Sequence, residues 1–203
     1  VARNAAEHVN ESLQAANWAI VDDGVSRTSG AGTSLLGTNQ INSFNASSGT
    51  AGISLVNNQS LVLGAVSAGT STQAINISTV GGSSNLTVGA LSGDDNLSLS
   101  AGGQLVLTGA LSGNTLSLTS GAQLELNHDI TASGGLTLAT TNGGNITQFT
   151  GAITVAGTTV ASAGAGDITL ANVANDFNQF GRTYSVRVQA DDGHFGYRSR
   201  GNY

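Results

Sequence analysis

The sequence predicts an all-β fold, a parallel β-solenoid, and three observations support this prediction. The phrase Leu-Thr-Val-Gly-Ala-Leu-Ser-Gly at residues 86–93 nearly recurs at residues 105–113 and, more loosely, at residues 146–157. Aliphatic residues alternate with small polar ones at a period of two, and glycine-containing pairs separate these runs. A unit of about twenty residues cannot bury its apolar face alone. Successive copies are therefore expected to stack as coils of one structure.

The first element expected is a short amphipathic α-helix, which we assign to an N-terminal segment of residues 1–24. Small apolar residues recur there at three- and four-residue steps, and polar residues occupy the other face. Val9, Leu13 and Trp18 are its candidate contact residues. An alanine-rich stripe buries little area, so this helix is expected to dock on the open end of the stack. Asp22-Asp23-Gly24 is expected to break it.

Residues 25–175 are assigned to the solenoid, with three short strands in each coil. The first strands are expected at Leu61, Leu86, Leu105, Leu124, Ile146 and Ile168. The second strands are expected at Val66, Leu91, Leu111, Ile130, Ile153 and Val173. The third strands are expected at Ile53, Ile75, Leu97, Leu116, Leu136 and, less clearly, Val160. Coils this short contain no helical crossover, so parallel pairing has to come from the coiling itself. An antiparallel sandwich is the alternative, but it does not require the same order of three strands in every repeat.

Residues 176–203 form the last segment, which is rich in aromatic residues and arginine. Six of the nine aromatic residues of the chain lie here. The segment has two interpretations, an aromatic cap that closes the stack or a joining surface for another subunit, because Tyr and Arg are enriched at interfaces. With the helix residues above, the predicted interface includes Phe177, Phe180, Tyr184, Arg187, Phe195, Tyr197, Arg198 and Tyr203.

Composition argues against several classes of function. Charged residues make up 9% of the chain, the net charge is −6, and lysine is absent. A nucleic-acid partner is not expected, because phosphate binding needs clustered Lys and Arg. No apolar run approaches eighteen residues, so no transmembrane helix is predicted. The chain begins at Val1 rather than Met, so we expect a processed protein or an excerpt of a longer one. It contains no cysteine and therefore no disulfide.

Candidate catalytic residues are few. Some parallel β-helices are polysaccharide lyases or hydrolases, and such sites need clustered acidic, basic or His side chains. Only Glu125, His128 and Asp129 fall close together within one coil, and we interpret them as a solvated corner. We therefore predict no catalytic residues.

No metal or cofactor site is predicted either. His8, His128 and His194 fall on three separate elements. Asp94-Asp95-Asn96 could offer oxygen ligands to calcium, but the same residues are typical of a plain β-turn. Further asparagines near turns are expected to form hydrogen-bonded ladders inside the coils. These are Asn85, Asn96, Asn114 and Asn145.

Residues from about 86 to 180 carry phrases of a recognisable kind. Examples are Gly144-Asn-Ile-Thr-Gln148, Gly151-Ala-Ile-Thr-Val155, Ala163-Gly-Ala-Gly-Asp-Ile-Thr-Leu170 and Asn175-Asp-Phe177. In these phrases the chain resembles the repeats of filamentous-haemagglutinin-like adhesins, which are bacterial exoproteins often secreted through a two-partner system. The resemblance implies a right-handed parallel β-helix, an extracellular or cell-surface location, and no catalytic residues to carry over.

The sequence therefore predicts a structural or adhesive bacterial cell-surface protein, such as a stalk or a fibre subunit able to associate end to end. Its expected partners are itself, as a head-to-tail homopolymer, and a host surface or carbohydrate receptor. The alternative function is a carbohydrate-active β-helix enzyme, a lyase or a hydrolase.

Overall fold

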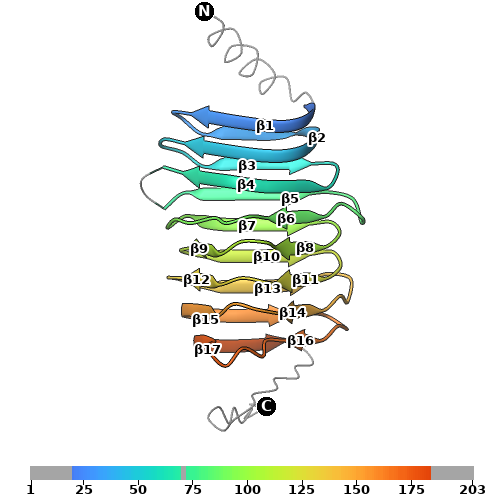
Figure 1. Cartoon of the computed structure of the whole chain (residues 1–203), viewed down its shortest axis with the longest axis vertical. Coiled ribbons are helices and arrows are strands. Elements are labelled where there is room, and N and C mark those ends of the chain that lie inside the picture. Colours follow the sequence, from blue (N-terminus) through green and yellow to red (C-terminus); the bar gives the residue numbers. More distant parts are fainter. Residues whose placement is uncertain (1–19, 70–71, 184–203) are drawn as a thin grey trace, which may run out of the picture.

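The computed structural model describes residues 20–69 and 72–183, which form an all-β parallel solenoid of about eight turns (Figure 1). The predicted fold class is confirmed at this level. The described residues contain no helix. The helix predicted within residues 1–24 and most of the predicted aromatic cap fall on residues 1–19 and 184–203, outside the described part of the chain.

The strands follow one another along the axis, from β1 at one end to β16 and β17 at the other (Figure 1). Those of the first half are β1 (Val21–Ser29), β2 (Thr33–Ser48), β3 (Ile53–Asn57), β4 (Leu61–Ala68), β5 (Ala74–Thr79), β6 (Leu86–Val88), β7 (Asn96–Ala101) and β8 (Leu105–Leu107). Those of the second half are β9 (Leu111–Gly113), β10 (Leu116–Ser120), β11 (Leu124–Leu126), β12 (Ile130–Ala132), β13 (Leu136–Thr140), β14 (Ile146–Gln148), β15 (Ile153–Ser162), β16 (Ile168–Thr169) and β17 (Asp176–Thr183).

The coils stack in the register that the aliphatic repeats predict. Leu61 pairs with Leu86, and Leu86 with Leu105. The same row continues through Leu124, Ile146 and Ile168, always in parallel. A second row runs through the third strands, from Ile53 and Ile75 to Leu97, Leu116 and Leu136. A one-residue slip would turn these side chains outward, so burial of one face sets the register.

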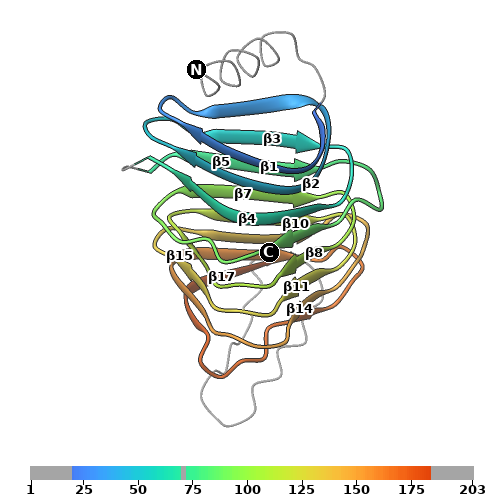
Figure 2. The ribbon, with the colours of Figure 1, turned by 45° about the horizontal axis from the view of Figure 1, so that its top comes forward.

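The coils that Figure 2 shows stacked on one another enclose one core cluster, whose buried side chains are aliphatic except for Phe44. Short strands such as β8 and β11 bury their first and third residues, while the middle residue is half-buried on the outer face. Burying each Leu or Ile contributes roughly 1.5–3 kcal/mol before conformational entropy is subtracted. Because every coil repeats this pattern, stability accumulates along the axis and depends on no single site.

Glycine allows the coils to approach closely at their corners. A Cβ built on Gly121 would lie 1.9 Å from the carbonyl oxygen of Gly102 in the preceding coil. Gly143 has φ +72°, a backbone conformation that side-chain-bearing residues rarely adopt. Both positions belong to glycine-containing pairs that the sequence predicted as corners.

Asp22-Asp23-Gly24, expected to break the helix and begin the coil region, lies inside β1, where β2 offers a parallel partner strand. The structure corrects two local expectations. Val173 was expected to point inward but is 80% exposed in a turn. Val160 is also exposed, and its neighbours Thr159 and Ala161 face the core instead. Val160 pairs with outward-facing Thr137, whereas Thr159 and Ala161 pair with the inward residues Leu136 and Leu138.

A row of buried, mostly polar residues lines one inner corner and was not predicted. The row runs through Asn39, Asn57, Thr79, Ala101, Ser120 and Thr140 in ladder register. Most of its polar side chains donate to a carbonyl of the turn that follows them, for example Thr79 Oγ1 to Ser84 at 2.7 Å and Thr140 Oγ1 to Gly144 at 2.6 Å, whereas Asn39 donates to the carbonyls of Leu35, Gly37 and Val56. The row therefore satisfies backbone groups where the strands end.

Candidate functional site

Phe177 and Phe180, two residues of the predicted interface, lie in β17 at the last described coil. They pair with Val155 and Thr159 of β15, both of which face the core. The two rings meet edge to face, with centroids 5.1 Å apart and planes at 68°. Both side chains are half-buried and pack against the core. The inward row therefore ends, in the described part, with an aromatic pair.

The other predicted interface residues lie outside the described part of the chain. They are Val9, Leu13, Trp18, Tyr184, Arg187, Phe195, Tyr197, Arg198 and Tyr203.

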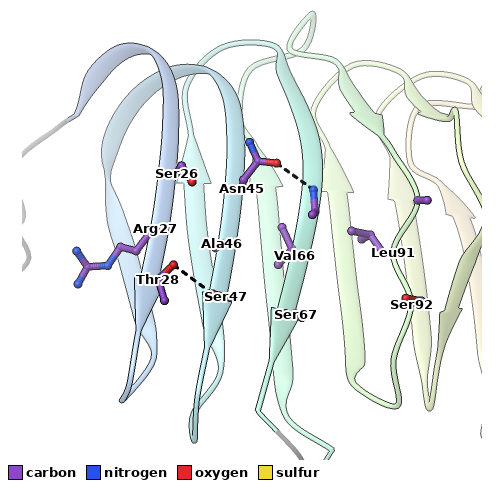
Figure 3. A pocket seen from close by; sticks show the side chains of 12 residues that line it. Ser26, Arg27, Thr28, Asn45, Ala46, Ser47, Val66, Ser67, Leu91 and Ser92 are labelled. Atoms are coloured by element: carbon purple, nitrogen blue, oxygen red, sulfur yellow. Dashed lines mark hydrogen bonds between the residues drawn. The ribbon is translucent and has the colours of Figure 1, made fainter.

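A shallow groove of about 400 Å³ crosses β1, β2, β4 and residues 90–92 (Figure 3). Ser26, Thr28, Asn45, Ser47 and Ser67 contribute hydroxyl or amide groups to its lining. Figure 3 shows the guanidinium of Arg27 extending away from the other labelled residues. Ala46, Val66 and Leu91 add apolar surface, so the groove has the mixed, open character of a sheet surface rather than the enclosure of a small-molecule site.

The predicted acidic corner does not form a clustered site. Glu125 accepts a hydrogen bond from Gln104 Nε2 at 2.5 Å. Asp129 accepts one from the backbone N–H of Ala152 at 2.8 Å, and His128 is exposed. No group of three His, Cys, Asp or Glu suited to a metal ion occurs among residues 20–69 and 72–183. Two of the three side chains therefore have defined partners in neighbouring coils.

Asp95 is the one buried carboxylate of the described residues, at 6% exposure. Its Oδ2 accepts the backbone N–H of Ala68 at 3.0 Å, and its Oδ1 accepts that of Gln73 at 3.1 Å. The carboxylate thus holds the two ends of the loop between β4 and β5. The Asp94-Asp95-Asn96 turn joins neighbouring coils through these charge-assisted bonds.

The asparagines expected to form ladders do bond along the axis, but on the outer corners. Asn85 Oδ1 accepts the N–H of Gln104 at 2.8 Å, and Asn145 Oδ1 accepts that of Asp167 at 2.9 Å. Asn114 Nδ2 donates to Asn96 Oδ1 at 3.0 Å. Asn85 and Asn145 are exposed. The expected position inside the coil is wrong for Asn85, Asn96 and Asn145, because each directly precedes an inward residue of a strand.

Amide ladders inside the coil involve Asn39 and Asn57 instead. Asn57 is fully buried and bonds the backbone of Ile41 in both directions, with Ile41 N–H donating to Oδ1 and Nδ2 donating to the Ile41 carbonyl, each at 2.8 Å. Asn39 Nδ2 donates to the carbonyl of Val56 at 2.9 Å. The sequence signal for Asn57 is that it follows Ile53 and Leu55 at the same two-residue step, so it takes the position of an inward residue; before Asn39 this step holds only Leu35 and Gly37.

A second amide cluster closes the coil nearest β17. Gln148 Nε2 donates to Asn175 Oδ1, and Asn175 Nδ2 donates to Gln148 Oε1, both at 2.8 Å. Asn172 Nδ2 donates to the carbonyl of Gly151 at 2.6 Å. This reciprocal pair holds the turn before β17 against the preceding coil.

Comparisons with known proteins agree with the repeat architecture. Residues 113–182 match the family described as "Repeats of unknown function (DUF5649)". No curated protein and no solved structure matches the chain significantly. The described residues contain no helix long and apolar enough to span a membrane. Fold and comparison together define a repeat protein of the β-solenoid class.

Proposed function

We propose that this chain is a structural segment of a bacterial cell-surface protein, a right-handed β-solenoid stalk or fibre subunit that associates end to end outside the cell. The single observation that supports this most is the continuous aliphatic core with its parallel ladders, which runs the whole described length. Adhesion to a host surface or a carbohydrate receptor, as in filamentous-haemagglutinin-like adhesins, is the finer form of the proposal.

A mechanical role follows from how the coils are held. Parallel strands lie about 4.8 Å apart, so about eight turns give a rod section roughly 35 Å long. Backbone hydrogen bonds between coils run along the rod, and the two ends of the described chain lie at opposite ends of it (Figure 1). Each added coil brings its own ladder and core segment, so length can grow without a change of design.

The two end surfaces support association of different faces. Among the described residues, the edge at one end is formed by β1 and the first part of β2, and the edge at the other end by β16 and β17. Phe177 and Phe180 lie in β17 at the second end, where their half-buried rings pack against the core and against each other. Contact between two different surfaces of identical chains generates an open filament. A head-to-tail polymer therefore requires no additional component.

The test is negative-stain microscopy and sedimentation of the purified chain and of a Phe177→Ser/Phe180→Ser variant. We expect threads or a concentration-dependent series of oligomers for the parent, and their loss in the variant. Phe149→Ser is the matched control, because Phe149 is 60% exposed on the side of the rod. Circular dichroism checks that both variants remain folded. A parent that stays monomeric at high concentration contradicts end-to-end association, as does equal loss with Phe149→Ser.

The proposal includes the absence of enzymatic activity. Glu125 and Asp129 both serve as acceptors for groups of neighbouring coils, which supports a structural interpretation. A screen for lyase and hydrolase activity on polysaccharides tests this. Turnover that is lost in Asp129→Asn would overturn it.

A further inference from the structure

We propose that end-to-end association continues the solenoid itself. In this arrangement β1 and the first part of β2 of one copy pair, in parallel, with β16 and β17 of a second copy, in the place of the following coil. The inference rests on the proposed function and adds to it the register of the contact and a residue that selects it. In the described part of the chain, both of these edges lack a partner strand on their outer side.

Two rows of paired residues run unbroken from the first described coil to the last. One begins at Gly24 and ends at Thr169, and every step between them is a parallel pair. The other begins at Thr33 and ends at Phe180 in the same way. A second copy placed one coil spacing, about 4.8 Å, along the axis therefore pairs Gly24 with Thr169 and Thr33 with Phe180.

The two edges are long enough for backbone pairing to hold copies together. At one end β1 has nine residues, and at the other β17 has eight. The unpaired N–H and C=O groups of such edges are a template for a strand from another chain. Both edges run in the same direction round the coil, so parallel pairing needs no rearrangement.

Arg27 gives the β1 end a specific requirement, because it is a charged residue at an inward position. It pairs with buried Ala46, and its Nε is buried without a hydrogen-bond partner among the described residues. Figure 3 shows its guanidinium extending beyond β1, away from the labelled residues of the neighbouring coils. A buried charged donor is costly unless it meets an acceptor. The β1 end therefore favours a partner surface that offers oxygen atoms.

The opposite end offers acceptors at the same place in the coil. The row of Arg27 passes through Ala46 and the groove of Figure 3, and its last aliphatic residue is Ile153. Asn175 continues the row, and its Oδ1 accepts the N–H of Ile153 at 2.9 Å. The next residue, Asp176, is exposed and makes no hydrogen bond with a described residue. In the continued solenoid, Arg27 lies over Asn175 and beside the carboxylate of Asp176.

Contacts between like ends lack this match. Two β1 ends would bring Arg27 against Arg27, and two β17 ends would bring Asp176 against Asp176. Like charges placed opposite each other disfavour the wrong partner surface. The charges on this row therefore favour head-to-tail contact.

The same register also brings acidic residues together at one outer corner. Asp22 and Asp23 lie directly before one end of the first row, and Asp167 lies two residues before its other end. All three are exposed, so their repulsion is modest. Asp167→Asn should therefore lower the dissociation constant by about two- to fivefold at low salt. Asp94→Asn, which removes an exposed carboxylate from the middle of the rod, should leave it unchanged.

Disulfide trapping under mild oxidation tests the register directly, because the chain contains no cysteine. Gly24→Cys/Thr169→Cys should give a series of disulfide-linked oligomers, since about 4.8 Å between paired Cα atoms suits a disulfide. The atom nearest the Cβ added at Gly24 is the hydroxyl oxygen of Ser43, at 2.7 Å, and that hydroxyl can rotate. Gly24→Cys/Thr147→Cys is the matched control. Thr147 lies in the same row one coil further in, about 9.6 Å from Gly24 of the other copy, which is too far for a disulfide.

Sedimentation of Arg27→Ala tests the role of the arginine. We expect a dissociation constant at least about tenfold higher than that of the parent, because a hydrogen-bonded charge is lost. Ser26→Ala, at the exposed position beside it, is the control and should change the constant less than about twofold. Circular dichroism checks that both variants are folded. Equal effects of the two substitutions would overturn the role of Arg27.

The outcomes separate this inference from the proposed function. A parent chain that stays monomeric overturns both. A parent that assembles while the two cysteine pairs cross-link equally, or while neither cross-links, overturns the register and leaves end-to-end association standing. Trapping of Gly24→Cys/Thr169→Cys alone supports a continuous solenoid.

Discussion

Replacing Asn57 by alanine tests whether the buried amide row stabilises the corners of the solenoid. The long strand β2 pairs first with β3 and then with β4. Asn57 is the last residue of β3 in this pairing, opposite Asn39, and the pairing with β4 begins at Ser43. Its side chain bonds both the N–H and the carbonyl of Ile41, and so takes the place of a neighbouring strand there. Nδ2 also donates to the carbonyl of Gln59 at 2.9 Å.

The expected loss follows from the groups that Asn57→Ala leaves without partners. Ile41 is fully buried, so water cannot replace the amide without entering the core. An unsatisfied buried donor or acceptor costs about 1–3 kcal/mol. Two such groups on Ile41 give a loss of about 2–6 kcal/mol in the free energy of unfolding.

Urea unfolding followed by circular dichroism measures this loss, and amide exchange at Ile41 locates it. Asn58→Ala is the matched control, because Asn58 is exposed and its side chain makes no hydrogen bond with described residues. We expect its effect to stay within about 0.5 kcal/mol. Equal effects of the two variants, or unchanged exchange at Ile41 in Asn57→Ala, would refute the reasoning.

The remaining predictions concern the core and the corners. Leu105→Ala should lower the free energy of unfolding by about 2–5 kcal/mol, because Leu105 is fully buried, whereas outward-facing Val106→Ala should cost less than about 1 kcal/mol by the same denaturation assay. Gly121→Ala should lower the thermal midpoint, because the added Cβ would clash with the backbone of Gly102. Gly82→Ala should leave the midpoint unchanged or slightly raised, because no atom lies within 4 Å of the added Cβ, and the opposite order would contradict the packing described.

Most of the coil register could be predicted because it depends on a single repeated requirement. Every coil must bury Leu, Ile or Val at the same steps, so Leu86 could only pair with its counterparts Leu61 and Leu105. Val160 and Val173 show where this reasoning fails. Thr159, and not Val160, aligns with inward Leu136, and Val173 lies in an exposed turn. Hydrophobicity alone indicates neither position.

The polar residues could be placed less well than the aliphatic ones. Asparagine suits turns and also substitutes for backbone partners inside a corner, so Asn57 and Asn85 look alike in sequence. What distinguishes them is register: Asn57 aligns with inward Thr79, whereas Asn85 directly precedes inward Leu86. That difference emerges only when the coil is aligned with its neighbours.

A solenoid separates the residues that determine its fold from those available for function. The inward rows and the close-packed glycines admit little change, because each contacts the coil before and after it. The outward residue between two inward ones meets mostly solvent, so it can vary without disturbing the register. Specific function in this chain is therefore expected at the rod's ends and on its outer corners. Phe177 and Phe180 occupy such an end, and the exposed asparagines occupy the corners.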